Sequence, residues 1–316
     1  MDPDSEIQFE FYPFIRQYKS GRVHRFFGTD IVPASVDPKT GVASKDVVIN
    51  ATSNLAVRLH LPNLSDKTTK KIPVFVYYHG GGFVIGSAFG PICHNHLNVL
   101  VAEANVIAVS VDYRLAPEHP LPIAYDDSWE ALNWVFSHAD KAGDEPWLAE
   151  HGDFSRVFLG GCSAGGNIAH QMAIRAGKAN LAIKGLVLIH PYFDGVEPVG
   201  LEVDLDADLK AKQEAMWRFI CPGTTGLDDP LANPFAEGKE GLRGLGCKKI
   251  MVGVAEKDIL RDRGRWYCEG LKKNGWGGVV ELLESEGEDH GFHVMKPSCE
   301  KALELNARTA MFLNSN

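Results

Sequence analysis

The sequence predicts an α/β protein in which a mostly parallel, eight-stranded sheet is flanked by helices. Short apolar or β-branched runs alternate with helix-like stretches through most of the chain, which is typical of a parallel sheet covered on both faces. The chain has 316 residues, of which 45% are hydrophobic and 23% are charged. This length and composition allow a large core within one domain spanning 1–316.

The expected elements follow one another without repeats. The first two strands, 46–51 and 55–61, are joined by Thr52-Ser53-Asn54, which predicts a hairpin. Six further strands are expected at 72–78, 105–111, 156–159, 184–189, 248–254 and 278–283. Helices are expected at 94–104, 125–139, 164–176, 261–274 and 299–313, with Gly177 as the stop of the third.

Two segments lie outside this alternation. Residues 9–15 include closely spaced aromatic side chains, so the start of the chain is too apolar for a disordered tail and should pack on another part of the protein. Residues 194–240 carry an acidic, helix-like run to Trp217 and then a stretch rich in proline and glycine. We interpret this second segment as a cap inserted between sheet elements.

Charge and cysteine content narrow the class of partner. The net charge of -9 argues against nucleic acid and acidic lipid, and favours a neutral small-molecule substrate. The six cysteines form no Cys-x-x-Cys pair, which argues against a zinc site and favours reduced thiols in the cytoplasm. The acidic start of the sequence has no apolar signal core, and no stretch has the length of a membrane span.

A candidate nucleophile lies between the strand expected at 156–159 and the helix expected at 164–176. Ser163 is the centre of Gly161-Cys162-Ser163-Ala164-Gly165, a G-x-S-x-G elbow in its required strand-to-helix context. Glycines suit the strained turn, and the helix N-terminus offers partial positive charge to an oxyanion. The motif also occurs by chance in loops that only position a helix. Whether Ser163 is a nucleophile therefore depends on whether the sequence also supplies an oxyanion loop, an acid and a base.

A candidate oxyanion loop follows the strand expected at 72–78. Residues 79–83 read His-Gly-Gly-Gly-Phe, and three consecutive glycines are costly to order unless backbone N–H groups must approach a ligand. We assign the oxyanion donors to the N–H groups of Gly81, Gly82 and Ala164. His79 is expected to be structural.

The acid and the base are expected after the last two strands. In G-x-S-x-G enzymes of this kind the chain order is serine, acid, histidine. Asp258 follows the strand at 248–254 and His290 follows the strand at 278–283, so both lie at carboxyl ends of strands, where open α/β sheets bind ligands. Asp262 and His293 are the alternatives. Gly291 favours His290, because it permits a sharp turn there.

With these residues placed, the sequence resembles the plant carboxylesterases of the hormone-sensitive-lipase group, in the α/β-hydrolase superfamily, over nearly its whole length. The shared motifs are His79-Gly-Gly-Gly-Phe83, Asp112-Tyr-Arg-Leu-Ala-Pro-Glu-His-Pro120, the elbow with Gly166-Asn167-Ile168-Ala169-His170, Asp258-Ile-Leu-Arg-Asp262 and Asp289-His290. The resemblance implies the α/β-hydrolase fold and the catalytic triad Ser163, Asp258 and His290. It also implies a helical cap, contributed by about 1–35 and 194–240.

One residue departs from the family pattern. The family usually has aspartate before the nucleophile, where this chain has Cys162. A cysteine nucleophile is not expected, because position 162 of the motif points away from the substrate, and we expect Cys162 to be a tolerated buried thiol. Relatives that are dehydratases or cyclases of plant specialised metabolism keep a non-hydrolytic function open. A hormone-receptor-like binding protein is disfavoured, because the related gibberellin receptors lack the catalytic histidine and His290 is present here.

The expected function is therefore a serine carboxylesterase that forms an acyl-enzyme and needs no cofactor or metal. The expected substrate is a small ester with a short acyl chain or an aromatic group, bound by a monomer or homodimer without nucleic acid or membrane. Apolar residues expected to line the pocket are Phe14, Phe83, Val84, Ile85, Phe193, Trp217 and Phe292.

Overall fold

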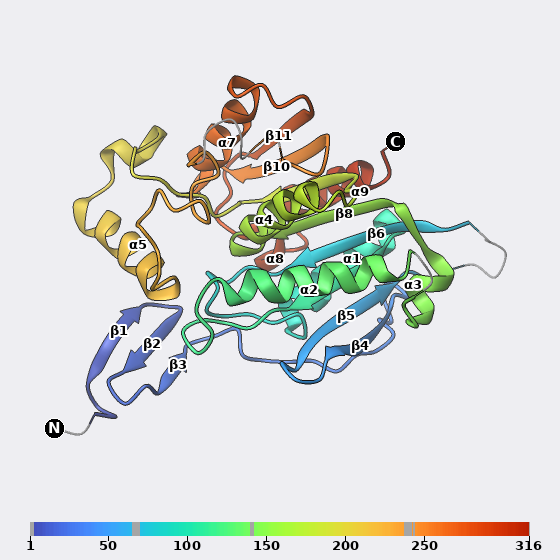
Figure 1. Ribbon diagram of the computed structural model, residues 1–316, viewed down its shortest axis with the longest axis horizontal. Coiled ribbons are helices and arrows are strands. Elements are labelled where there is room, and N and C mark those ends of the chain that lie inside the picture. The colour runs from blue at the N-terminus through green and yellow to red at the C-terminus, as the bar shows by residue number, and fades with distance from the viewer. Residues whose placement is uncertain (1–2, 65–69, 140–141, 237–241, 243, 316) are drawn as a thin grey trace.

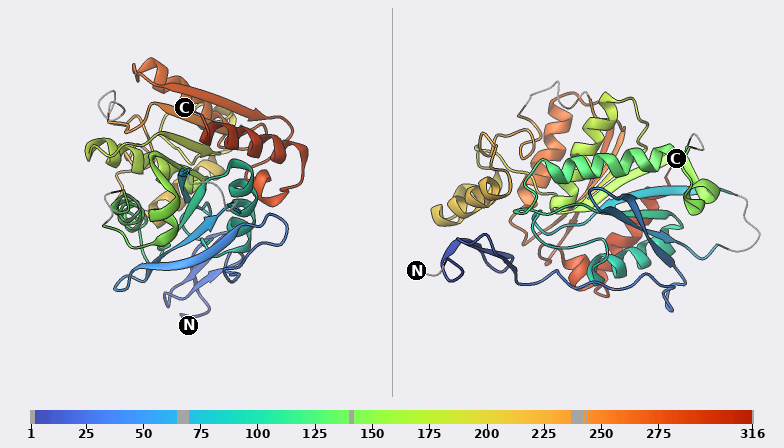
Figure 2. Two further views of the ribbon diagram at one scale, coloured as in Figure 1. Left: turned by 90° about the vertical axis from the view of Figure 1, so that its right-hand side faces the viewer. Right: turned by 60° about the horizontal axis from the view of Figure 1, so that its bottom comes forward.

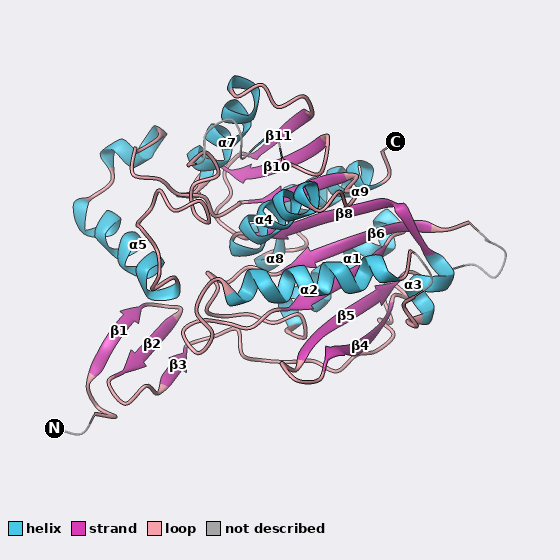
Figure 3. Cartoon of the chain, viewed as in Figure 1, coloured by secondary structure: helices cyan, strands magenta, loops and turns pink. Residues whose placement is uncertain are grey.

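The computed structural model describes residues 3–64, 70–139, 142–236, 242 and 244–315 (Figure 1). Its centre is a twisted eight-stranded sheet in the order β11-β10-β9-β8-β6-β7-β5-β4 (Figure 3). β5 pairs antiparallel with β4 and with β7, and the other neighbours in the sheet are parallel. The strands are β4 (Ala43–Asn50), β5 (Leu55–Leu61), β6 (Ile72–Tyr78), β7 (Ile107–Asp112), β8 (Gly152–Cys162), β9 (Gly185–Ile189), β10 (Lys249–Ala255) and β11 (Val279–Ser285).

All eight strands expected from the sequence are present in this sheet. The largest boundary difference is in β8, which begins at Gly152 rather than at 156. Gly152 of β8 pairs with Ile72 of β6. After Pro73 the register shifts, so that the next residue, Val74, pairs with Val157. The sequence does not show this extension, because Gly152-Asp153-Phe154-Ser155 is not a continuous apolar run, and Gly152 and Asp153 are joined to the sheet by their pairing with β6.

The sheet is buried on both faces by two layers of helices (Figure 2). Side chains alternate between the layers, as strand geometry requires: Val74 and Val76 join one core cluster, and Phe75 and Tyr77 join the other. The first face, which we call the α4 face, is covered by α2 (Ile123–Ser137), α4 (Ala164–Lys178) and α7 (Arg261–Lys273). The opposite α9 face is covered by α1 (Pro91–Ala104), α8 (Phe292–Met295) and α9 (Glu300–Leu313). None of the helices within the described ranges combines the length and apolar character that a membrane crossing requires.

The third predicted helix ends differently from the expectation. Gly177 lies inside α4, which continues to Lys178, and the left-handed residue after it is Asn180, with φ 57°. A Cβ at position 177 would lie 1.6 Å from the carbonyl oxygen of Gly244. Glycine is therefore required at position 177 because α4 packs closely against the loop at Gly244, and not because the helix ends there. The local sequence does not reveal this contact.

The segments expected to form a cap differ in structure. The insertion contains a short 3₁₀ turn, η1 (Gly200–Asp204), and α5 (Ala207–Ile220). The N-terminal segment is a separate antiparallel sheet of β1 (Ile7–Phe11), β2 (Ile15–Tyr18) and β3 (Val23–Arg25), so the expectation of a helical N-terminal contribution is wrong. Ile-Gln-Phe-Glu-Phe in β1 alternates apolar and polar residues, which favours a strand.

These two segments contact each other at one end of the molecule (Figure 1). Phe9 of β1 stacks on Phe219 of α5, with ring centroids 3.9 Å apart and ring planes inclined by 11°. α3 (Pro146–His151) lies at the opposite end, just before β8. Residues 1–2 and 237–240 of the expected cap lie outside the described residues.

Candidate active site

The proposed nucleophile lies in a strained turn. Ser163 joins the end of β8 to the first residue of α4, with φ 57° and ψ −120°, and it is half-buried. A non-glycine residue in such a conformation costs about 1–3 kcal/mol, so the surrounding packing must hold it. A Cβ at Gly165 would lie 1.9 Å from the carbonyl oxygen of Tyr78, and one at Gly161 would lie 2.4 Å from the same oxygen. Glycine at both positions lets the elbow approach the end of β6.

The glycine loop after β6 lies against this elbow. Gly81 and Gly82 have φ of 111° and 60°, a region that residues with side chains rarely adopt. A Cβ at Gly81 would lie 2.1 Å from the carbonyl oxygen of Ile85, and one at Gly80 would lie 3.3 Å from Cβ of Ser163. The loop therefore turns tightly with its backbone next to the serine.

The third expected oxyanion donor belongs to the helix that follows the serine. Ala164 is the first residue of α4, where backbone N–H groups have no acceptor within the helix. The N–H groups of a helix N-terminus carry partial positive charge and favour an anion. The glycine loop and the first residue of α4 thus both lie next to Ser163.

The segment that follows β7 supports the glycine loop. Tyr113 donates a hydrogen bond from its hydroxyl to the carbonyl oxygen of His79, at 2.7 Å, and its ring stacks on the imidazole at 4.2 Å. The backbone N–H of Ala116 donates to the carbonyl oxygen of Phe83, at 2.9 Å. Burial lowers the pKa of His79, so this imidazole is neutral near pH 7 and packs as part of the loop support.

The N-terminal segment also contacts this loop. Arg25, at the end of β3, donates from Nε to the carbonyl oxygen of Val84 at 2.6 Å and from a terminal nitrogen to that of Ala116 at 3.1 Å. Its guanidinium is also paired with Glu118. A segment more than fifty residues upstream therefore helps to hold the residues beside the glycine turn.

The acid and base expected from the sequence meet at the carboxyl edge of the sheet. His290 Nδ1 lies 2.8 Å from Asp258 Oδ2, and the Asp258 side chain is fully buried whereas that of His290 is 39% exposed. The other Asp258 oxygen accepts a hydrogen bond from the N–H of Leu260, at 2.9 Å. A histidine held by a carboxylate through Nδ1 keeps its proton there, which leaves Nε2 as the basic nitrogen.

The alternative acid and base lie elsewhere. Asp262 pairs with Arg261, at 2.9 Å, and accepts a hydrogen bond from the N–H of Leu201 in the insertion, at 2.8 Å. His293 is buried in α8, where its ring lies 5.2 Å from that of His96. Asp258 and His290 are thus the pair that the structure brings together.

Sequence reasoning missed one histidine beside this pair. His190 directly follows β9, its ring lies 5.4 Å from that of His290, and its Nδ1 accepts a hydrogen bond from the N–H of Gly291 at 3.2 Å. Burial lowers the pKa of His190 to about 3. His190 directly follows a predicted strand, which is the same signal that identified Asp258. The sequence was therefore sufficient to predict that His190 lies at this edge of the sheet.

Cys162 is a buried thiol on the α9 face, within the second core cluster. Burial raises its pKa to about 12, with a further contribution from the negative charge of Asp258. The thiol is therefore protonated near neutral pH, which argues against a nucleophilic role.

The expected pocket residues divide between the two faces of the sheet. Six belong to the core cluster on the α4 face: Phe83, Val84, Ile85, Phe193 and Trp217 are buried in it, and Phe14 packs against it. Phe292 lies instead in the cluster on the α9 face, with its ring 5.6 Å from that of His190. The left-handed Gly291, with φ 69°, turns the chain into α8 between His290 and Phe292, which explains why Phe292 departs from the expected set.

Comparisons with known proteins place the chain in a family. A family model described as the alpha/beta hydrolase fold matches residues 75–294. The chain is 48% identical to tuliposide A-converting enzyme 2, chloroplastic, of Tulipa gesneriana, over 98% of this chain and 79% of that protein. It is 45% identical to probable carboxylesterase 2 of Arabidopsis thaliana, over 98% of this chain and 97% of that protein.

Two further similarities bear on the chemistry. The chain is 46% identical to 2-hydroxyisoflavanone dehydratase of Glycyrrhiza echinata, over 98% of this chain and 96% of that protein. Among solved structures, an esterase of Pyrobaculum calidifontis is 31% identical, with a TM-score of 0.69 over 85% of this chain and 84% of that one. The similarity therefore spans hydrolases and at least one plant enzyme named for an elimination.

Proposed function

Because this chain belongs to the α/β-hydrolase family and is a carboxylesterase, we propose that it cleaves a small-molecule ester through an acyl-enzyme on Ser163. The serine Oγ attacks the ester carbonyl while His290 accepts its proton, and His290 then returns a proton to the leaving alcohol. Water, deprotonated by the same histidine, attacks the acyl-enzyme and releases the acid. Asp258 orients His290 through Nδ1 and stabilises the imidazolium.

The observation that carries this proposal is the combination of a strained serine elbow with a carboxylate-held histidine. Ser163 at φ 57° is held where its side chain projects from a sharp turn, and the 2.8 Å contact from Asp258 to His290 prepares the base. We assign the oxyanion hole to the N–H groups of Gly81, Gly82 and Ala164. Removing one such donor typically lowers kcat by about a hundred- to a thousandfold.

We further propose that residues 1–35 and 194–240 form a cap over an apolar pocket. The stacking of Phe9 on Phe219 supports this, because it joins the two segments. The hydrogen bond from Arg25 to the carbonyl oxygen of Val84 supports it as well, because it links the N-terminal segment to the residue that follows the glycine loop. A neutral substrate with a short acyl chain or an aromatic group suits an apolar pocket in a protein with a net charge of -9.

Oligomeric state and location complete the proposal. We propose a monomer or homodimer in the cytoplasm, although the Tulipa relative carries a chloroplastic designation. Light scattering of purified protein and fractionation of plant cells that express the full chain would test these two points. Recovery with chloroplasts, or a larger assembly, would contradict them.

A second candidate function is elimination of water on the same site. Cys162 favours it as a departure next to the nucleophile, and so does the similarity to a 2-hydroxyisoflavanone dehydratase. In such a reaction His290 would remove a proton from the carbon next to the one that carries the hydroxyl, a double bond would form between these two carbons, and the imidazolium of His290 would return the proton to the hydroxyl as it leaves as water. Ser163 would then not form a covalent bond with the substrate.

The test is hydrolysis of p-nitrophenyl acetate and butyrate by wild type and by Ser163→Ala. Ser155→Ala, an exposed serine near the start of the same strand, serves as the control. We expect turnover that Ser163→Ala abolishes and Ser155→Ala keeps. Turnover that survives in Ser163→Ala contradicts the proposal, and conversion of 2-hydroxyisoflavanone by that variant would favour elimination.

A further inference from the structure

Three side chains with metal-binding donor atoms meet beneath the nucleophile elbow. The thiol of Cys162 and one ring nitrogen each of His190 and His293 lie within 4.8 Å of one another, and all three residues are buried. They come from the ends of β8 and β9 and from α8, so they meet at the carboxyl edge of the sheet on the α9 face. The proposed hydrolysis uses none of the three as a reacting group.

Most of the ring nitrogens in this cluster have no hydrogen-bond partner. His190 Nε2 and both nitrogens of His293 are unpaired, and the two residues are 1% and 5% exposed. A buried polar atom without a partner is unfavourable, and native proteins normally satisfy such atoms with protein, water or an ion. An ion that accepts lone pairs from both nitrogen and sulfur would give a partner to one nitrogen of each imidazole, and so to two of these three unpaired nitrogens.

We propose that Cys162, His190 and His293 bind a soft divalent transition-metal ion, with Zn²⁺ as the reference ion. One thiolate and two imidazoles form a donor set that suits zinc and does not suit Mg²⁺ or Ca²⁺. Zn–N and Zn–S bonds of about 2.0–2.3 Å place neighbouring ligand atoms about 3.3–3.8 Å apart in a tetrahedral site. The donors, already within 4.8 Å of one another, need modest side-chain adjustment, and the fourth position is left for water.

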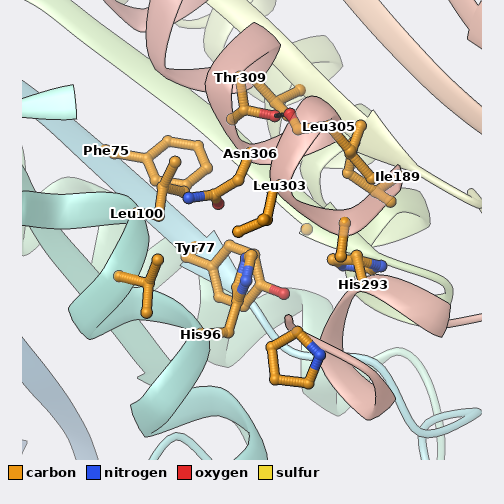
Figure 4. A pocket seen from close by; sticks show the side chains of 15 residues that line it. Phe75, Tyr77, His96, Leu100, Ile189, His293, Leu303, Leu305, Asn306 and Thr309 are labelled. Carbon is orange, nitrogen blue, oxygen red and sulfur yellow. Dashed lines mark hydrogen bonds between the residues drawn. The ribbon is translucent and has the colours of Figure 1, made fainter. Parts of the chain in front are cut away.

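Charge and access also suit this ion. The carboxylate of Asp258 acts electrostatically on both Cys162 and His190, so it offsets the single positive charge left by Zn²⁺ and one thiolate. A cavity of about 30 Å³ adjoins the cluster between the sheet, α1 and α9, with Tyr77, His96 and His293 in its lining (Figure 4). This volume is enough for a water-sized occupant.

Metal binding should inhibit hydrolysis, because His190 also supports the turn next to the catalytic base. His190 Nδ1 accepts the hydrogen bond of Gly291 N–H, so the ring proton is on Nε2. A metal on Nε2 requires the proton to move to Nδ1, which can then no longer accept from Gly291, and the thiol proton of Cys162 passes to solvent. Loss of this one hydrogen bond beside His290 should lower activity by about three- to tenfold.

Binding is tested first by spectroscopy, independently of ester hydrolysis. Purified full-length protein is titrated with Co²⁺, and a near-ultraviolet thiolate-to-cobalt charge-transfer band is expected. Cys162→Ala and Cys162→Ser should lose the band. Cys93→Ala should keep it, because Cys93 is a buried thiol of the same core cluster that instead hydrogen bonds to Ser110. Absence of the band from wild type, or its persistence in both Cys162 variants, overturns the proposal.

Inhibition is measured next, with each variant compared with its own metal-free activity on p-nitrophenyl butyrate. Zn²⁺ should lower wild-type activity three- to tenfold, a chelator should restore it, and Cys162→Ala should be insensitive. His190, Asp258 and His290 also lie within 4.8 Å of one another, so a metal could bind the catalytic pair instead. Equal inhibition of wild type and Cys162→Ala would indicate that second mode and overturn the proposal.

Discussion

Replacing Gly165 with alanine tests how closely the elbow must approach the neighbouring strand. The added Cβ would lie 1.9 Å from the carbonyl oxygen of Tyr78, whereas Cβ contacts below 3.0 Å are essentially never found. The elbow and the end of β6 must therefore separate by at least about 1.1 Å, and the atoms that would move are backbone. β6 leads directly into the glycine loop, so the separation displaces the oxyanion donors relative to Ser163.

A displacement of about 1 Å in an active site can lower the rate about a hundredfold, which corresponds to about 2.7 kcal/mol in the activation free energy. We expect Gly165→Ala to lower kcat/KM on p-nitrophenyl butyrate by at least this factor. Overpacking should also lower the free energy of unfolding by about 1–3 kcal/mol. Urea unfolding and steady-state kinetics measure the two effects separately.

Gly277→Ala is the matched control, because a Cβ at position 277 meets no atom within 4 Å. Its activity should stay near the wild-type value and its stability should change by no more than about 0.5 kcal/mol. If folded Gly165→Ala retains activity within about threefold of wild type, the elbow does not need this contact. Close approach of the elbow to β6 would then not be the reason for glycine at position 165.

Three further predictions concern other parts of the structure. Asp258→Asn should lower kcat by at least about a hundredfold with little change in KM, because it removes the charge that orients His290, and unchanged kcat would contradict this role. Arg263→Ala should lower the free energy of unfolding by about 3–5 kcal/mol, because this buried guanidinium is paired with Glu202 at 2.7 Å. Urea unfolding measures the loss, and a loss below about 1 kcal/mol would show that the pair is dispensable. Stability should also fall as pH drops from 6.5 towards 3, because certain buried histidines stay neutral in the folded state while the unfolded chain takes up protons, each contributing up to about 1.4 kcal/mol per pH unit. Burial lowers the pKa of these side chains to about 3: His60, His170 and His190. Unfolding free energies that are equal at pH 7.5 and 5.5 would refute this last prediction.

The sequence alone predicted the strands of the sheet and the pairing of Asp258 with His290, because both expectations rest on local patterns. β6, for example, is a short run of apolar and β-branched residues from Ile72 to Tyr78, and a run of this length that is followed by glycines is typical of a buried strand. Asp258 and His290 were identifiable because each directly follows a predicted strand, and parallel strands present their carboxyl ends at one edge. The family motifs in their order then identified the fold.

Tertiary structure decided what depends on contacts between distant segments. It assigned Gly177 to a close contact with Gly244, placed Phe292 on the face opposite the other residues that were expected to line the pocket, and paired Asp258 rather than Asp262 with His290.

The cluster of Cys162, His190 and His293 is the clearest case. Its members are separated in sequence and form no spacing motif, and they lie close together because the ends of β8 and β9 and the start of α8 meet at the same edge of the sheet. A sequence pattern records the conformation of neighbouring residues, whereas proximity between these side chains is produced by the order of the strands. The strand-to-helix turn at Ser163 could therefore be predicted from its motif, whereas the grouping of Cys162, His190 and His293 beneath it required the fold.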